Sequence, residues 1–164
     1  MTYRAKRVDL RLPLLESALS SNREHLHRAL EAVLDSPGRR LGIIGLAFKE
    51  QTDDLRESPV VSLVEALVGK GRLIRVFDPQ IQFDTIYGSN RDYALLQIPH
   101  IRAVLDESIE KTIAWADELI VAQKLPTAYA ARIAASGLPV IDLVSPSLEY
   151  LQETSLEQGR ALVA

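Results

Sequence analysis

The chain of 164 residues contains no cysteine. This absence excludes a disulfide framework and a thiolate metal site, and it is typical of a cytoplasmic protein. Neither positive nor negative charge is in large excess, because the formal net charge is only −3. The overall charge therefore gives no reason to expect nucleic acid or an anionic membrane as a partner, and we expect no metal site.

Long apolar runs are also missing from the sequence. No run approaches the ~18 residues that a membrane span needs, and the segment Met1–Arg7 lacks the apolar core of a signal peptide. Hydrophobic residues nevertheless make up 47% of the chain, which is enough to bury a core. A chain of this length and composition is expected to form one domain with an appendage.

The glycine-rich motifs of common nucleotide-binding loops are absent as well. The stretch GIIGLAF at 42–48 does not fit G-x-G-x-x-G, and G-x-x-x-x-G-K-[ST] occurs nowhere. The sequence therefore argues against a P-loop triphosphatase and lacks the standard dinucleotide fingerprint. A Rossmann-like fold remains compatible with this absence.

Apolar segments after residue 39 alternate between strand-like and helix-like patterns. We expect strands at 41–46, 73–77, 118–122 and 139–143, and helices at 59–68, 91–97, 105–114 and 127–135. Strands that alternate with helices form βαβ units and a parallel sheet. The sequence therefore predicts an α/β fold, a Rossmann-like parallel sheet in a three-layer αβα arrangement.

An α-helical arm is expected to precede this domain. Apolar residues recur at helical spacing over 12–35. Ser21-Asn22 with Glu24 resembles a second helix start, which predicts one kinked helix or two short helices. Pro37-Gly38 ends the segment. We therefore divide the chain into an arm, residues 1–37, and a Rossmann-like domain, residues 38–164.

Six charged residues follow the first expected strand within nine positions: Lys49, Glu50, Asp53, Asp54, Arg56 and Glu57. Ser58 and Pro59 then suit the N-cap and the first turn of a helix. Ligands of open α/β sheets bind at the carboxyl ends of the strands, and a helix N-terminus favours an anion. The charged loop therefore lies where a phosphorylated ligand is expected.

Two interpretations of this loop remain open from the residues alone. Lys49 offers a compact positive charge and Arg56 a planar fork, and both are suited to phosphate oxygens. The same cations can instead pair with Asp53 and Asp54 in a solvated loop, as surface charges commonly do. Composition does not decide between a phosphate site and such a loop.

A family resemblance favours the first interpretation. The segment GLAFKEQTDDLRESPVVSLVEALVGKG (45–71), followed by IRVFDP (74–79), resembles the C-terminal domain of the UDP-glucose/GDP-mannose dehydrogenases. The pattern Gly-Leu-x-Phe-Lys, then Thr-Asp-Asp-x-Arg-x-Ser-Pro, is long and specific. TYRA (2–5) and SNRDYALLQIPHI (89–101) look more like the GDP-mannose 6-dehydrogenase branch than the UDP-glucose branch. The resemblance covers residues 2–144.

The resemblance implies a function for the chain as part of a larger enzyme. Family enzymes oxidise the C6 alcohol of a nucleotide sugar to a carboxylate in two hydride transfers to NAD, through intermediates on a cysteine. The arm then matches the end of the middle, dimerisation domain, and a homodimer or higher oligomer is expected. NAD is bound mainly by a domain outside this chain, and GDP-mannose is the expected ligand. Because the chain has no cysteine, we expect no catalytic residue in it and no activity alone.

Family roles are carried over only where the motif matches. Phe48 and Lys49 are expected to bind the nucleotide sugar, although core packing remains an alternative for Phe48. Arg56 is expected to contact NAD, with an internal ion pair as the alternative, and Ser58 is expected to be a helix cap. Gln123 and Lys124 follow the strand expected at 118–122 and lie near the same edge of the sheet, but the resemblance gives them no role.

Two other functions stay open at this stage. The first is the C-terminal domain of a UDP-sugar 6-dehydrogenase, since the two branches share the motif. The second is a non-enzymatic module that binds a nucleotide or another protein. A comparison of nucleotide-sugar binding distinguishes these possibilities.

Overall fold

The structure is a computed structural model, and it describes residues 12–47, 54–81, 92–94, 96 and 98–144. The chain divides into two units, residues 1–36 and 37–164. The described part of the first unit is a single helix, α2 (Pro13–Asp35), which starts with a proline in its first turn. It continues through Ser21 and Asn22, so of the two expected alternatives, one kinked helix or two short helices, the structure has a single helix. No proline or glycine follows Pro13 within the helix to interrupt it.

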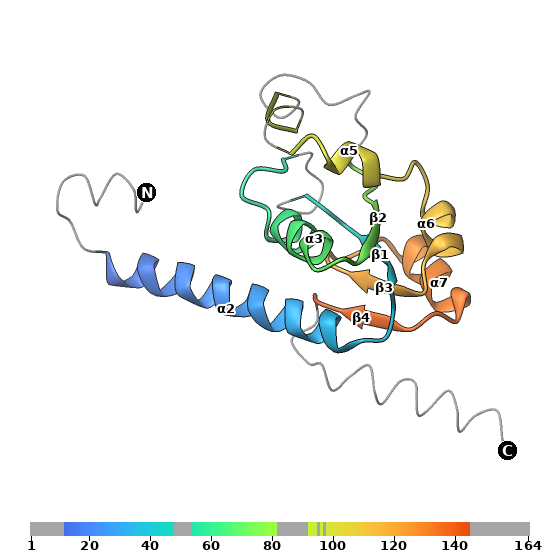
Figure 1. Cartoon of the computed structure of the whole chain (residues 1–164), viewed down its shortest axis with the longest axis horizontal. Helices are drawn as coiled ribbons and strands as arrows, with labels where there is room; N and C mark the ends of the chain where they lie inside the picture. The colour runs from blue at the N-terminus through green and yellow to red at the C-terminus, as the bar shows by residue number, and fades with distance from the viewer. Residues whose placement is uncertain (1–11, 48–53, 82–91, 95, 97, 145–164) are drawn as a thin grey trace, which may run out of the picture. The chain divides into compact units, whose positions relative to one another are not determined.

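The second unit contains a four-stranded sheet with the order β2-β1-β3-β4, in which all neighbouring strands are parallel. Its elements are β1 (Arg40–Ile44), α3 (Pro59–Gly69), β2 (Leu73–Phe77), α5 (Ile101–Val104), α6 (Ile109–Trp115), β3 (Glu118–Val121), α7 (Thr127–Ser136) and β4 (Val140–Asp142). Helix α3 lies on one face of the sheet, and α6 and α7 lie on the other (Figure 1). The predicted α/β fold with a three-layer αβα arrangement is confirmed.

One predicted helix begins later than expected. Leu105, at the start of the helix expected at 105–114, has extended backbone and forms a parallel bridge with Val76 of β2. The helix starts only at Ile109, because Ser108 is its N-cap and accepts a hydrogen bond from Lys111 N at 3.4 Å. The apolar pattern therefore marked the segment correctly but placed the helix start too early.

Strand β1 lies at the centre of the core, and its side chains alternate between the two faces of the sheet. Ile44 packs in the cluster with residues of α6 and α7, and Gly42 approaches the same side. A Cβ atom on Gly42 would lie 2.8 Å from Leu119 Cδ2 and 2.9 Å from Thr112 Cγ2. This glycine therefore allows α6 to pack directly against the sheet. Leu41 and Ile43 are fully buried and point to the opposite face, the side of α3.

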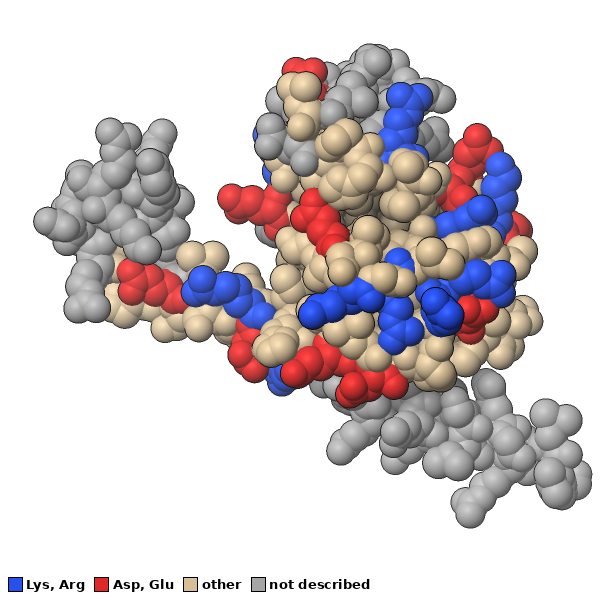
Figure 2. All heavy atoms as spheres, in the orientation of Figure 1, with Lys and Arg blue, Asp and Glu red and all other residues tan. Residues whose placement is uncertain are grey.

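The surface carries both signs of charge. On the face drawn in Figure 2, Lys and Arg side chains lie beside Asp and Glu side chains. Arg40 pairs with Asp117 at 2.6 Å, and Arg75 lies 3.5 Å from Asp106.

None of the helices in the described ranges combines the length and the apolar content of a transmembrane segment. Nor do metal-ligating side chains gather in groups of three or more within those ranges.

Candidate functional site

The expected site lies in the loop between β1 and α3, and the structure describes its two ends. Phe48 and Lys49 lie outside the described residues, as does Asp53. The described ends are Gly45–Ala47 on the β1 side and 54–58 on the α3 side. The two ends therefore define the described geometry of this loop.

The first end is held by Asp78, the residue that follows β2. Its Oδ2 atom accepts hydrogen bonds from Leu46 N at 2.7 Å and Ala47 N at 3.0 Å. Its Oδ1 atom accepts one from Gln80 N at 2.8 Å, and the side chain is buried. The adjacent Gly45 N donates to Phe77 O at 2.8 Å. The chain after β1 is thus fixed to the chain after β2.

This use of Asp78 separates the domain from dinucleotide-binding Rossmann domains. In those domains an acidic residue about 20 positions beyond the glycine motif binds a ribose hydroxyl. Here both carboxylate oxygens accept backbone N–H groups of the protein itself. From the sequence, Asp78 was noted only within the segment IRVFDP (74–79), and no role was predicted for it. Its place directly after β2 was the signal that it faces the neighbouring loop of β1.

Ser58 holds the second end. Its Oγ atom accepts hydrogen bonds from Val60 N at 3.2 Å and Val61 N at 3.5 Å, so the predicted N-cap is confirmed. The same hydroxyl donates to Leu46 O at 2.7 Å, a link to the first end that the sequence did not reveal. Ser58 is 1% exposed. One buried hydroxyl therefore joins the start of α3 to the chain after β1.

The cap also changes the expected source of positive charge. We expected backbone N–H groups at the start of α3 to favour an anion. Pro59 has no N–H group, and those of Val60 and Val61 are bonded to Ser58. The N–H groups of Val60 and Val61 are therefore already used within the protein, which weakens the expectation that they favour an anion.

Arg56 is held in a defined orientation by Asp54. Asp54 Oδ1 accepts hydrogen bonds from Arg56 N at 3.0 Å and Nε at 2.8 Å, and Oδ2 accepts one from Nη2 at 2.7 Å. The internal ion pair considered from the sequence is therefore present. The Arg56 side chain remains 49% exposed, so the pair orients the guanidinium without burying it.

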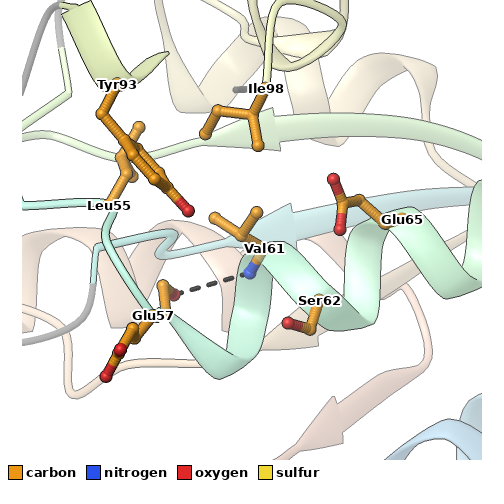
Figure 3. Close-up of a pocket in the computed structure, with 8 residues that line it drawn as sticks. Leu55, Glu57, Val61, Ser62, Glu65, Tyr93 and Ile98 are labelled. Atoms are coloured by element: carbon orange, nitrogen blue, oxygen red, sulfur yellow. Dashed lines mark hydrogen bonds between the residues drawn. The ribbon is translucent and has the colours of Figure 1, made fainter. Parts of the chain in front are cut away.

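A cavity of about 250 Å³ lies beside the start of α3, and it is poorly suited to phosphate. Its lining includes two carboxylates, Glu57 and Glu65, which repel an anion. Glu57 also has a left-handed backbone, with φ of 55°. Figure 3 shows Tyr93 and Ile98 opposite Val61 of α3. The full lining is Leu55, Glu57, Ser58, Val61, Ser62, Glu65, Tyr93 and Ile98.

Comparison with known proteins agrees with this description of the fold. A sequence model described as the UDP-glucose/GDP-mannose dehydrogenase family, UDP binding domain, matches residues 42–134. A GDP-mannose 6-dehydrogenase of Pseudomonas putida is 38% identical over 97% of this chain and 36% of that protein. A GDP-mannose 6-dehydrogenase of Pseudomonas savastanoi is 36% identical over 98% of this chain and 36% of that protein.

A solved structure gives the same result. The crystal structure of a ternary complex of GDP-mannose dehydrogenase from Pseudomonas aeruginosa has a TM-score of 0.74 at 34% identity. The match covers 87% of this chain and 33% of that one. The chain spans about a third of the length of the curated relatives it matches. The motif in the first βα loop, the parallel sheet and these similarities together show that the chain belongs to the UDP-glucose/GDP-mannose dehydrogenase family.

Proposed function

We propose that the chain is the nucleotide-sugar-binding C-terminal part of an NAD-dependent GDP-mannose 6-dehydrogenase. The observation that carries this proposal is the similarity to GDP-mannose 6-dehydrogenases, which extends over 97% of the chain. The complete enzyme then converts GDP-mannose to GDP-mannuronate in two hydride transfers. It works in the cytoplasm as a homodimer or a higher oligomer.

In this proposal the loop after β1 binds the ligand. Phe48 and Lys49 contact the nucleotide sugar, and Arg56 contacts NAD, most of which is held by a domain outside these residues. The fixed backbone at Leu46 and Ala47 supports this assignment, because it holds the chain immediately before Phe48. The defined geometry and partial exposure of Arg56 support its role, since Asp54 holds a guanidinium that remains 49% exposed.

The covalent step of the oxidation must take place elsewhere. A thioester mechanism needs a thiolate, and the sequence contains no cysteine. We therefore expect the purified chain of 164 residues to bind nucleotide sugar without oxidising it. Formation of NADH from GDP-mannose by this chain alone would contradict the proposal.

A UDP sugar is the second candidate ligand. It is favoured by the description of the matching family model, which names a UDP binding domain. A module that binds a nucleotide or another protein without any enzymatic role is the remaining alternative. It is consistent with a binding edge that contains no nucleophilic cysteine.

Isothermal titration calorimetry of the chain with GDP-mannose, UDP-glucose and NAD tests these proposals. We expect saturable heat with GDP-mannose, weaker binding of UDP-glucose and the weakest binding of NAD. Lys49→Ala should weaken GDP-mannose binding about tenfold, the effect of losing one charge-assisted contact. Lys70→Ala, at the opposite end of α3, is the matched control and should leave the affinity unchanged.

Each other outcome has a defined meaning. Tighter binding of UDP-glucose than of GDP-mannose would identify a UDP-sugar dehydrogenase. Absence of saturable binding by either nucleotide sugar would contradict the proposed ligand class. An unchanged affinity in Lys49→Ala would contradict the assigned residue.

A further inference from the structure

We draw no further inference here: the strongest candidate, the cavity beside the start of α3 with Glu57, Glu65 and Tyr93 in its lining, carries no proposal, because Glu65 already pairs with His100 at 3.3 Å and nothing else in the described part of the chain points to a ligand there.

Discussion

At the residue scale, the site depends on a few side chains that bond to backbone rather than to one another. Asp78 and Ser58 are almost completely buried, and each bonds to Leu46 or Ala47. A buried polar group without a hydrogen-bond partner costs free energy. Removing one of these side chains therefore destabilises the fold, because a backbone group of Leu46 or Ala47 loses its partner. Leu46 and Ala47 are therefore held by side chains of the protein itself.

Ser58→Ala should lower the free energy of unfolding by about 2–3 kcal/mol, because it removes a helix cap and leaves the buried Leu46 carbonyl without its donor. Ser108→Ala is the matched control, since Ser108 also caps a helix, α6, but through a contact that is exposed. We expect a loss of about 0.5–1 kcal/mol there. Urea unfolding followed by circular dichroism measures both changes. Equal losses would show that the link to Leu46 contributes nothing.

The sequence predicted some of these residues and not others, for a physical reason. The cap at Ser58 was predictable because a helix cap is local and the Ser-Pro pair lies directly before an apolar run. The hydrogen bonds that join Asp78 and Gln123 to the backbone of Ala47 span 31 and 76 positions, respectively. Such contacts depend on the order and register of the strands, which single-sequence patterns do not supply. The roles assigned to Phe48, Lys49 and Arg56 stay predictions.

At the element scale, close packing of α6 against β1 decides the shape of the core. Gly42→Ala should lower the free energy of unfolding by about 1–2 kcal/mol, because the added methyl group meets the buried Leu119 and Thr112 side chains. Gly69→Ala is the matched control, since nothing lies within 4 Å of a Cβ atom there. That variant should gain about 0.5–1 kcal/mol through helix propensity. A stabilised Gly42→Ala would contradict the described packing.

Ionic contacts also join the starts of two neighbouring strands. Asp117, just before β3, accepts hydrogen bonds from Arg40 of β1 through N at 3.0 Å, Nε at 3.0 Å and Nη2 at 2.6 Å. The side-chain hydrogen bond with Arg40 lowers the pKa of Asp117. The folded chain therefore binds this proton less readily than the unfolded chain, whose aspartate has a pKa of about 3.9. The pair stabilises the fold above about pH 4, and this contribution disappears as pH falls through the folded pKa.

Asp117→Asn tests this linkage through the urea midpoint measured from pH 7 to pH 2. The variant should be less stable than the wild type at pH 7, and the difference should shrink as the medium becomes acidic. The contribution is modest, because both side chains are well exposed to solvent. Two curves that stay parallel down to pH 2 would show that Asp117 contributes nothing to the acid dependence.

The order of elements was more predictable than their boundaries. The four strands lie where apolar runs predicted them, and β2 occupies the predicted residues. The helix expected at 105–114 was placed too early, because the backbone of Leu105 is extended and forms a parallel bridge with Val76 of β2. Apolar spacing shows that a segment is buried, but it does not show whether a sheet or a helix buries it.

At the scale of the whole molecule, the sheet is Rossmann-like, but the described residues do not form the features by which such a sheet binds a dinucleotide. The glycine motif is absent, Asp78 bonds to the protein itself, and the first N–H groups of α3 are bonded to Ser58. The acidic cavity beside α3 does not suit a phosphate. The described start of α3 and the cavity beside it therefore give little support for an anion, and the binding role of the loop after β1 stays a proposal.

The most direct test of this account is to locate GDP-mannose on the chain by NMR, with ¹⁵N-labelled protein titrated with the nucleotide sugar. The account predicts saturable chemical-shift changes at the amides of Leu46 and Ala47 and in the segment from Arg56 to Val61, on both sides of the loop. It also predicts that Lys49→Ala reduces these changes at equal ligand concentration. Saturable shifts that leave these amides unaffected and gather around Tyr93, Ile98 and Glu65, in the acidic cavity, would contradict it.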